Sequence, residues 1–366
     1  MEHSTEAAHH FASAEHVTSV QEYGTGNVND TYLVTVNSRG DSHFILQRIN
    51  QRVFRKPDLI MVNLRAFSDH VQKRLSNGMG DPTRRWELPR VLYTGDGKSF
   101  YVDSEGGFWR AISFIDHSHA YPRVRDSAHA REAGYALGRF QSLISDMDTQ
   151  SLHDTLEGFH ITPRYLKHYH DVLANRRAGD DPPDVESCLR FVAEREEWTS
   201  VLENAKASGR LRLRPIHGDP KVDNIMIDEE TGLAVSIVDL DTVKPGLVQY
   251  DIGDCLRSCC NLLGEETTRY DEVAFDVGLC REIMRGYLSV TSGFFTDDDY
   301  AYLYDSIRLI AFELGLRFFT DYLEGNVYFK VKHDRHNLSR AIVQFRLCES
   351  IEKQERDIRA IIDELR

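Results

Sequence analysis

The chain has 366 residues, of which 41% are hydrophobic and 28% are charged, a composition typical of a soluble globular protein with a substantial core. Its formal net charge of −14 repels the phosphates of nucleic acids and of anionic lipids, so we expect neither as a partner. No stretch reaches the roughly 18 apolar residues of a membrane span, and the acidic N-terminus lacks the apolar core of a signal peptide. We therefore expect a cytoplasmic protein with reduced cysteines, and we expect it to be a monomer.

The first part of the chain has the pattern of an antiparallel β sheet. Alternating side chains and turn residues predict strands near residues 17–23, 31–36, 44–49, 90–93 and 108–114. One helix is expected over residues 57–76, because Pro57 and Asp58 suit the first turn of a helix. We therefore predict a β-rich N-terminal lobe over residues 1–115, with a connector near residues 114–118.

The remainder of the chain has a mainly helical pattern. An amphipathic helix is expected over residues 129–146, and only residues 216–241 interrupt the helical pattern with β character. Further helices are predicted at residues 163–174, 184–208, 271–291, 297–322 and 335–365. The expected architecture is an α+β fold, with a small antiparallel β lobe followed by a larger, mainly helical lobe over residues 119–366.

The most informative segment contains the sequence HGDxxxxN, in which the acidic residue is Asp219 and the final residue is Asn224. An apolar run follows and ends at Asp239. Phosphoryl transfer needs a carboxylate that orients the attacking hydroxyl and accepts its proton, and it needs oxygen ligands that hold Mg²⁺ on the nucleotide phosphates. Asp219 suits the first role, and Asn224 and Asp239 suit the second. Their order is that of the catalytic loop and the metal-binding loop of protein kinases.

Two neighbours of these residues are expected to support the loop rather than to take part in the chemistry. His217 is a candidate general base, but we expect it to brace the catalytic loop. Asp251 is expected to anchor the same loop through hydrogen bonds and not to touch substrate.

A glycine-containing loop between the first two predicted strands is a candidate nucleotide site. Glycine lets backbone amides approach a phosphate closely, although a plain hairpin turn is the alternative interpretation. Because the loop lies in the first hairpin of the β lobe and HGDxxxxN follows downstream, we expect nucleotide contacts here. The candidate residues are Gly24, Gly26, Asn27 and Asn29.

Several further stretches carry a resemblance to known proteins. They are YGTGNVNDTYLVT (23–35), FILQRIN (44–50), REAGYALGRFQ (131–141), FHITP (159–163), IVDLDTVKPG (237–246), LRFFTDYLEGNVYF (316–329) and HNLSR (336–340). The catalytic segment resembles the aminoglycoside phosphotransferase and choline kinase superfamily, and these stretches are similar to its N-acetylhexosamine 1-kinase branch. The resemblance implies a two-lobed protein-kinase-like fold, with ATP and Mg²⁺ as cofactors. It also implies transfer to the anomeric hydroxyl of N-acetylglucosamine or N-acetylgalactosamine.

For individual residues, the resemblance implies further roles. Asp241 matches the second acidic residue of the superfamily's metal motif, and is implied to be a metal ligand or to lie behind one. Arg317 and Tyr328 match positions that contact the sugar in the sugar-kinase branch. His160 is a further candidate for the substrate side, with helix capping or packing as the alternative.

The third predicted strand departs from the protein-kinase pattern. Protein kinases carry a lysine there that binds the α- and β-phosphates. Gln47 occupies the matching position, and its neighbour Arg48 faces the opposite side of the strand. Gln47 is therefore a candidate nucleotide contact, and the groups that replace the lysine stay open.

Two other functions are compatible with the sequence. One is a kinase of aminoglycosides or of other small molecules with a hydroxyl group, whose cationic members would suit an acidic chain. The other is a catalytically silent binding protein with a kinase fold, against which the intact catalytic and metal-binding residues argue.

Overall fold

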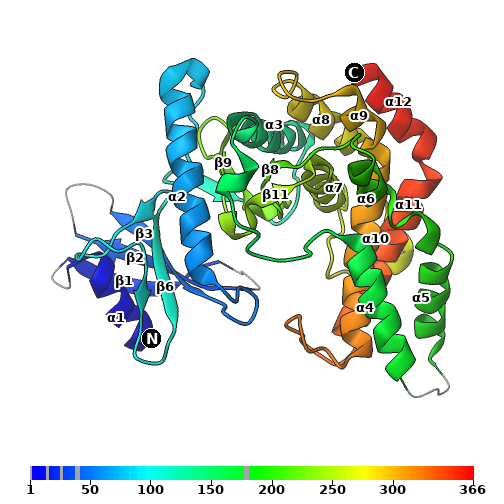
Figure 1. Cartoon of the computed structure of the whole chain (residues 1–366), viewed down its shortest axis with the longest axis horizontal. Helices are drawn as coiled ribbons and strands as arrows, with labels where there is room; N and C mark the ends of the chain where they lie inside the picture. Colours follow the sequence, from blue (N-terminus) through cyan, green and yellow to red (C-terminus); the bar gives the residue numbers. More distant parts are fainter. Residues whose placement is uncertain (1, 14–15, 25–27, 38–41, 82, 177–180) are drawn as a thin grey trace.

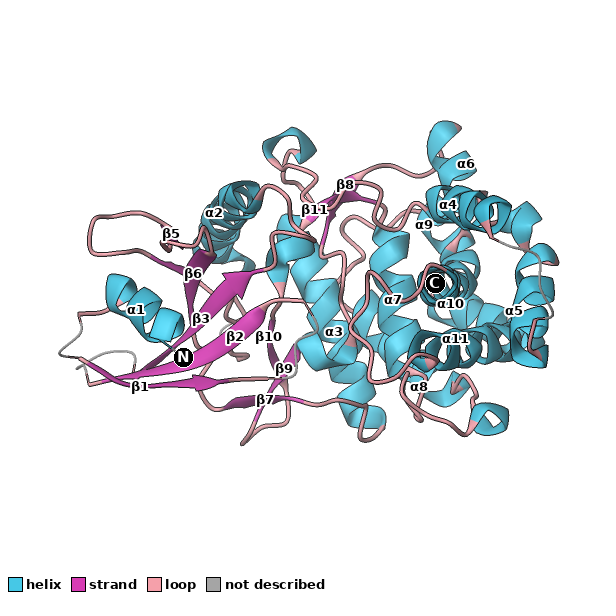
Figure 2. Cartoon of the chain, turned by 90° about the horizontal axis from the view of Figure 1, so that it is seen from below, coloured by secondary structure: helices cyan, strands magenta, loops and turns pink. Residues whose placement is uncertain are grey.

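The computed structural model describes residues 2–13, 16–24, 28–37, 42–81, 83–176 and 181–366. Strands gather at one end of the molecule and helices at the other (Figure 2). The predicted α+β class, with an antiparallel sheet and a helical part, is confirmed. The limits of the two lobes, 1–115 and 119–366, stay a prediction.

The N-terminal sheet is antiparallel, and within the described residues it has six strands. They are β1 (Val17–Glu22), β2 (Asp30–Val36), β3 (His43–Ile49), β4 (Val91–Leu92), β5 (Tyr101–Val102) and β6 (Phe108–Ser113). Strands β1, β2, β3 and β6 follow one another across the sheet, and β4 and β5 both pair with β6. The register places Gln47 on β3 directly opposite Arg110 on β6.

A helix that the sequence analysis missed, α1 (Glu2–Phe11), packs on this sheet. Ala7 and Ala8 are fully buried in a cluster with Leu46 and Trp109. The expectation of a single helix in the first 115 residues was therefore wrong. The helix was missed for a physical reason. A short helix that buries mainly alanines has little hydrophobic periodicity and depends on tertiary packing for its stability.

Helix α2 (Pro57–Arg74) continues into a π-helical turn at Leu75–Met79. In Figure 1 this helix stands between the N-terminal sheet and the central part of the molecule. The chain leaves the sheet at Ser113 and joins a second sheet at β7 (Ser118–Ala120).

Small strands in the centre position the predicted catalytic segment. β7 pairs with β9 (Ile225–Asp228), which pairs with β10 (Ala234–Ile237), and β8 (Arg214–Ile216) pairs with β11 (Lys244–Gly246). HGD directly follows β8, Asn224 directly precedes β9, and Asp239 lies just beyond β10. These strands therefore bring the three candidate residues to neighbouring loops.

Helices make up most of the rest of the chain, and α10 packs against α4, α7 and α11. They are α3 (Ser127–Ile144), α4 (Thr162–Asn175), α5 (Pro183–Ala193), α6 (Val201–Ala207), α7 (Val248–Cys259), α8 (Val277–Leu288), α9 (Asp297–Ala301), α10 (Leu303–Leu323), α11 (His336–Lys353) and α12 (Glu355–Leu365). The single helices predicted over 184–208, 297–322 and 335–365 are each broken in two, because apolar periodicity continues across a local kink.

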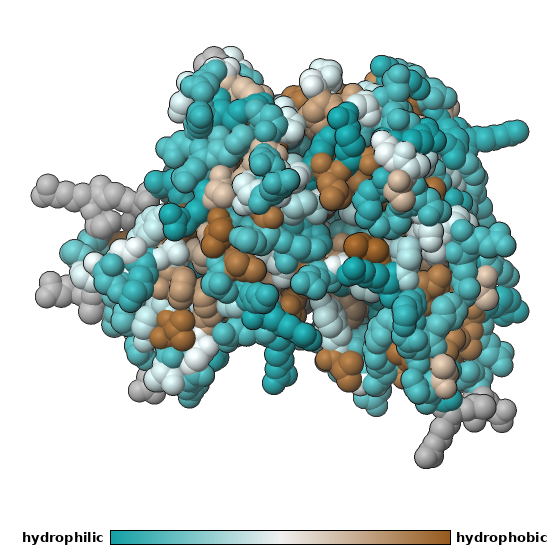
Figure 3. Space-filling model, in the orientation of Figure 1, coloured by the Kyte–Doolittle hydropathy of each residue, from teal (hydrophilic) through white to brown (hydrophobic). Residues whose placement is uncertain are grey.

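Among the described helices, none is long and apolar enough to cross a bilayer. The face drawn in Figure 3 is largely hydrophilic, with hydrophobic residues in small separated groups. All six cysteines are buried and free.

Candidate active site

The catalytic loop after β8 is held by hydrogen bonds from its own backbone. The Asp251 carboxylate on α7 accepts the N–H groups of His217 and Gly218, each at 2.8 Å. Gln141 of α3 donates a further bond to the same carboxylate at 2.8 Å. The predicted anchoring role of Asp251 is thus confirmed.

Gly218 lets the loop pass close to the segment beyond Asp239. Its φ is +90°, and an added Cβ would lie 2.7 Å from the carbonyl oxygen of Thr242. The Thr242 hydroxyl donates to the carbonyl of His217 at 2.8 Å. Only glycine permits this approach, which ties the loop after β8 to the turn that follows Asp239.

His217 braces the same junction. Its Nε2 donates to the Val238 carbonyl at 3.0 Å, and its Nδ1 accepts the N–H of Asp219 at 3.2 Å. An imidazole that donates with one nitrogen and accepts with the other is neutral, and burial lowers the pKa of His217 accordingly. The bracing role predicted for this residue is confirmed.

The Asp219 carboxylate lies beside the ammonium of Lys221, with 3.6 Å between Nζ and Oδ2. Burial works to raise the pKa of Asp219, but the surrounding positive charges, Lys221 first, outweigh it and lower this pKa. The Asp219 charge in turn raises the pKa of Lys221. An ionised carboxylate therefore faces the cleft. The sequence analysis missed Lys221, although it lies inside the HGDxxxxN motif.

His160 supports the loop from behind. It has a left-handed backbone conformation, with φ of 64°. Its Nδ1 lies 3.0 Å from Glu313 Oε1, and its Nε2 lies 2.7 Å from the Gly218 carbonyl oxygen. Both partners are acceptors, so both ring nitrogens carry hydrogen. Burial works to lower the pKa of His160, but the Glu313 carboxylate outweighs it and raises this pKa. Protein groups thus bond to both ring nitrogens of His160. The predicted contact of His160 with substrate stays a prediction.

Asp239 lines the same cleft, and the buried Asn224 lies next to this segment, since its backbone carbonyl accepts the N–H of Val238 at 2.8 Å. The Asn224 amide donates to the Asp219 carbonyl at 2.8 Å, which leaves its side-chain oxygen available. Asp239 has φ of 64° and ψ of 58°, a conformation that costs a non-glycine residue about 1–3 kcal/mol and occurs mainly at functional sites. Its carboxylate has no hydrogen-bond or ion-pair partner within the part of the chain that the structure describes. Burial, followed by the charges of Asp241 and Asp219, raises the pKa of Asp239 to about 7.

These observations fit a bound Mg²⁺. The Asp239 side chain is exposed to the cleft, and a carboxylate close to other carboxylates is stabilised by a cation. Hard oxygen donors are the ligands that Mg²⁺ prefers. Across the described residues, no three His, Cys, Asp or Glu side chains form a metal site by themselves. Nucleotide phosphates and water would therefore complete the shell around Asn224 and Asp239.

Asp241 is engaged by the N-terminal sheet. One of its carboxylate oxygens forms an ion pair with Arg110 of β6, and the other accepts the side-chain N–H of Asn29 at 2.7 Å. The Asp241 and Arg110 side chains are 1% and 2% exposed. Its role as a metal ligand stays a prediction, and these contacts place it behind Asp239.

The candidate nucleotide residues of the β lobe differ in their relation to the cleft. Asn29 lines the cleft, and its Oδ1 accepts the N–H of Asn50 at 3.0 Å. Gln47 does not line the cleft, because its side chain is bonded to Arg110. Gly24 has φ of 77° at the start of the glycine loop, whereas Gly26 and Asn27 lie outside the described residues. The nucleotide contacts of all five stay predictions.

A cleft of about 400 Å³ connects the predicted catalytic residues to the predicted sugar-binding residues. Asp219, Lys221 and Asp239 line one part of it, and Arg317 and Tyr328 line another. A second cavity, of about 300 Å³, adjoins the cleft and shares its lining at Arg317 and Tyr328. The structure thus brings together residues that lie about a hundred positions apart in the chain.

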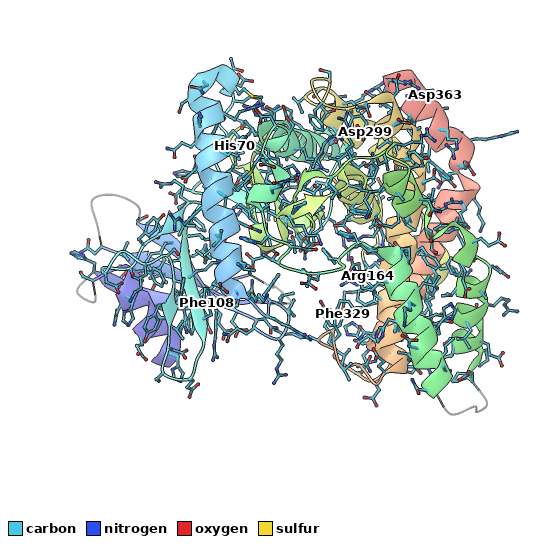
Figure 4. The ribbon with its side chains drawn as sticks, in the orientation of Figure 1. His70, Phe108, Arg164, Asp299, Phe329 and Asp363 are labelled. Carbon is cyan, nitrogen blue, oxygen red and sulfur yellow. The ribbon has the colours of Figure 1, made fainter. Side chains whose placement is uncertain are left out.

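Arg317, on α10, is enclosed by aromatic rings. Its guanidinium carbon lies 5.1, 5.0 and 5.5 Å from the ring centres of Phe159, Tyr165 and Phe329. No hydrogen bond or ion pair joins its side chain to any described residue. In Figure 4, Phe329 lies on the segment after α10, beneath Arg164 at the start of α4. We call Arg317 and these three rings the acceptor end.

Asp321 fixes the segment that carries Tyr328. Its carboxylate accepts the backbone N–H groups of Val327, Tyr328 and Phe329, at 2.8, 2.7 and 3.0 Å. Asn337 donates to the same carboxylate at 2.8 Å. Tyr328 itself is 52% exposed at the rim of the cleft. The sequence analysis missed Asp321, whose only signal was its place in LRFFTDYLEGNVYF.

The other carboxylates that line the cleft are paired with cations or hydrogen-bond donors. Arg257 pairs with Asp254 and Glu265, and Lys221 lies 3.9 Å from Asp223. The remaining pairs join Glu266 to Lys332, His336 and Arg340, and Glu313 to His160 and Thr162. The acceptor end therefore presents one positive charge, and Glu157, in the lining of the adjoining cavity, is a carboxylate without a hydrogen bond or ion pair to any described residue.

The fold and the site define a phosphotransferase with a kinase-like fold. The chain belongs to the phosphotransferase enzyme family (APH), whose model matches residues 19–285, well over half of its length.

Solved structures with the same fold have low sequence identity to this chain. A choline/ethanolamine kinase family protein from Mesorhizobium loti has a TM-score of 0.61 at 15% identity, with 100% of each chain covered. An aminoglycoside phosphotransferase from Alicyclobacillus acidocaldarius has a TM-score of 0.58 at 14% identity, covering 96% of this chain and 95% of that one. A spectinomycin phosphotransferase in complex with ADP and spectinomycin has a TM-score of 0.52 at 12% identity, covering 93% of each. At these identities the likeness shows the fold alone.

Proposed function

We propose that the protein is an ATP- and Mg²⁺-dependent kinase that phosphorylates the anomeric hydroxyl of a free N-acetylhexosamine. The observation that carries the choice of acceptor is the acceptor end, where the Arg317 guanidinium has no partner while Glu313 and Glu266, which line the cleft with it, are paired. Such a site suits a neutral, polar molecule and disfavours a polycation. The choice of an N-acetylhexosamine and of its anomeric hydroxyl rests on the sequence resemblance.

The nucleotide and the metal are supported by two separate observations. The spectinomycin phosphotransferase that shares this fold was solved with ADP. In this chain, Asp239 is a partly enclosed carboxylate without a partner, and Asn224 has a free side-chain oxygen beside it. We assign the metal to these two residues, with Asp241 behind them. When bound, Mg²⁺ neutralises negative charge that develops on the phosphates.

The proton transfer in this reaction is assigned to Asp219. As the acceptor oxygen bonds to the γ-phosphorus, the bond from that phosphorus to the β–γ bridging oxygen breaks, and the hydroxyl proton passes to Asp219. Its low pKa keeps Asp219 ionised at neutral pH but makes it a weak base. An anomeric hydroxyl is more acidic than an ordinary alcohol, so a weak base suffices for this acceptor.

Arg317 and Tyr328 are assigned to the sugar. A guanidinium carries several donors and no acceptor, so Arg317 suits ring hydroxyls or the acetamide carbonyl. The exposed ring of Tyr328 suits stacking against a pyranose. We further propose that the protein acts as a monomer in the cytoplasm.

The alternative function is a kinase of a cationic acceptor, such as an aminoglycoside. The net charge of −14 favours it, because an acidic protein attracts cations over its whole surface. Against it stands the acceptor end, since recognition of several ammonium groups requires several unpaired carboxylates or uncovered aromatic faces, and Glu157 is the one unpaired carboxylate among the described residues of the adjoining cavity. Arg317 occupies the faces of three rings there.

A screen of acceptors with Mg-ATP, followed by ADP release, tests the proposal. Free N-acetylglucosamine or N-acetylgalactosamine should give turnover, and choline, ethanolamine and kanamycin should not. Asp219→Asn protein in the same screen controls for contaminating kinases. Turnover of a cationic acceptor with none of either hexosamine would reject the sugar assignment. Absence of turnover with every acceptor would favour the silent binding protein.

A further inference from the structure

The glutamine on β3 leaves the β lobe without the lysine that protein kinases place there. The cation nearest to this position is Arg110, directly opposite Gln47 on β6. Gln47 Oε1 accepts two bonds from it, from Nε at 3.0 Å and from Nη2 at 2.7 Å. Gln47 Nε2 donates to the Thr31 hydroxyl at 3.1 Å, which sets the orientation of the amide. Gln47 thus holds the guanidinium in one plane.

Arg110 extends from this clamp to the metal-binding turn. It forms the buried ion pair with Asp241, whose second oxygen is held by Asn29 of the glycine loop. Asp241 lies in the 3₁₀ turn Leu240–Thr242, which begins directly after the left-handed residue Asp239. Strand β6, through Arg110, and the glycine loop, through Asn29, therefore meet at one carboxylate, two residues beyond the proposed metal ligand.

The charges around the turn Leu240–Thr242 require the cation of Arg110. Asp219, Asp239 and Asp241 bring three carboxylates close together in a partly buried site. Arg110 and Asn29 together compensate the charge on Asp241, which has almost no contact with solvent. Removal of one partner from such a buried pair leaves an uncompensated charge, which disturbs the turn around it.

We propose that Arg110 is a positioning residue that acts through Asp241 on the turn that presents Asp239. In this way the β lobe supports metal binding through a buried ion pair, whereas protein kinases use a lysine that binds phosphate. The inference rests on the proposed use of Mg²⁺ and a nucleotide. It does not depend on which acceptor is phosphorylated.

Calorimetric titration with ADP, in the presence and absence of Mg²⁺, tests the link without relying on turnover. Wild-type protein should bind ADP more tightly with Mg²⁺. Arg110→Lys keeps the charge but loses the paired bonds to Gln47 that orient the guanidinium, and Asp241→Asn removes the charge that it meets. Each variant should lose roughly 10- to 100-fold of the Mg²⁺-dependent affinity. Both should bind ADP alone as the wild type does. The double variant should lose little more than the weaker-binding single variant, because both changes break one interaction.

Arg48→Lys is the matched control. Arg48 is the neighbour of Gln47 on β3, but its guanidinium lies over the Trp109 ring on the opposite side of the strand. This variant should bind ADP as the wild type does, with and without Mg²⁺.

Several outcomes overturn the inference. Wild-type affinity of Arg110→Lys for Mg-ADP would do so. An equal loss of affinity without Mg²⁺ would also do so, since it indicates that Arg110 contacts the phosphates directly. If the unfolding midpoint shows that Arg110→Lys is not folded, Gln47→Met takes its place in the titration. An unchanged Mg²⁺-dependent affinity of Gln47→Met for ADP would then reject the link. A wild-type protein whose ADP affinity does not respond to Mg²⁺ rejects the proposed function itself, and this inference with it.

Discussion

The proposed reaction centre and the proposed acceptor end of the cleft are built in different ways. The reaction centre comes from one short segment, residues 216–242, whose loops are bonded to one another through Asn224, His217 and Thr242. The acceptor end combines rings that precede α4 or lie on it with Arg317 on α10 and Phe329 beyond it.

Because of this difference, the residues proposed for the transfer step are separate from the residues proposed to select the acceptor. A transfer step needs oxygen atoms in fixed positions, and short-range bonds within one segment provide them. Acceptor preference depends on side chains that tertiary packing brings together, so it can change while the reaction centre stays the same. We therefore expect variants of the reaction centre to lower kcat for any acceptor. Variants of the acceptor end should raise the KM of the acceptor and leave nucleotide binding unchanged.

The largest effect is expected for Asp219→Asn. Loss of the proton acceptor should lower kcat by roughly two orders of magnitude or more, while calorimetry shows unchanged affinity for ADP. Asp228→Asn, on the same segment but outside the lining of the cleft, should retain kcat within about twofold, as surface substitutions usually do. Near wild-type turnover of Asp219→Asn would contradict the role of Asp219 as proton acceptor, and with it the division of roles between the two regions.

The next largest effect is expected for Arg317→Ala. Loss of a charged hydrogen-bond donor should raise the acceptor KM roughly 10- to 100-fold, with a smaller change in kcat and an unchanged KM for ATP. Arg308→Ala is its control, because Arg308 lies on the same helix and pairs with Asp305 away from the cleft. A fall in kcat alone, with both KM values unchanged, would contradict the division of roles.

Lys221→Met should have an intermediate effect. It removes the cation that lowers the pKa of Asp219, so the acid limb of the kcat/KM profile should move to higher pH. Each pKa unit of lost interaction moves the acid limb by one pH unit, so activity at a fixed pH on that limb falls about tenfold. The pH profiles of wild type and variant with one acceptor provide the measurement, and superimposable profiles would show that Lys221 does not act on Asp219.

The smallest effect is expected on stability, for Glu266→Gln. Burial works to raise the pKa of Glu266, but Lys332, Arg340 and His336 outweigh it and lower this pKa from 4.5 to about 2. A lowered pKa stabilises the folded state above the unfolded value, and the contribution is lost as the pH falls through the folded value. The variant should therefore unfold at a lower temperature than the wild type at pH 7, by an amount equivalent to about 1 kcal/mol or less. The difference should be smaller at pH 3, and a constant difference at both pH values would contradict the pairing.

The sequence predicted the elements with strong periodicity. Strands β1 to β3 and helix α3 lie within two residues of their predicted limits, since alternating or amphipathic patterns are long there. The kinks between α9 and α10 and between α11 and α12 were missed, because the apolar stripe continues through each of them. Helix α1 was missed because contact with the sheet, and not its own pattern, stabilises it.

The candidate site was predictable to the extent that it is local. Asp219, Asn224 and Asp239 belong to one motif with defined spacing, and the structure brings them together. The link from Arg110 to Asp241 was not predictable, because it depends on the register of β3 against β6 and on the approach of two sheets. The contacts of Asp321 with the backbone at 327–329 likewise appear only when the segment after α10 folds back.

The position of the phosphate on the product tests the central claim most directly. N-acetylglucosamine or N-acetylgalactosamine is incubated with Mg-ATP and the protein, and the product is examined by phosphorus NMR. Our account predicts coupling of the phosphorus to the anomeric proton, which identifies the sugar 1-phosphate. Coupling to the C6 methylene protons would identify a 6-phosphate and would contradict it.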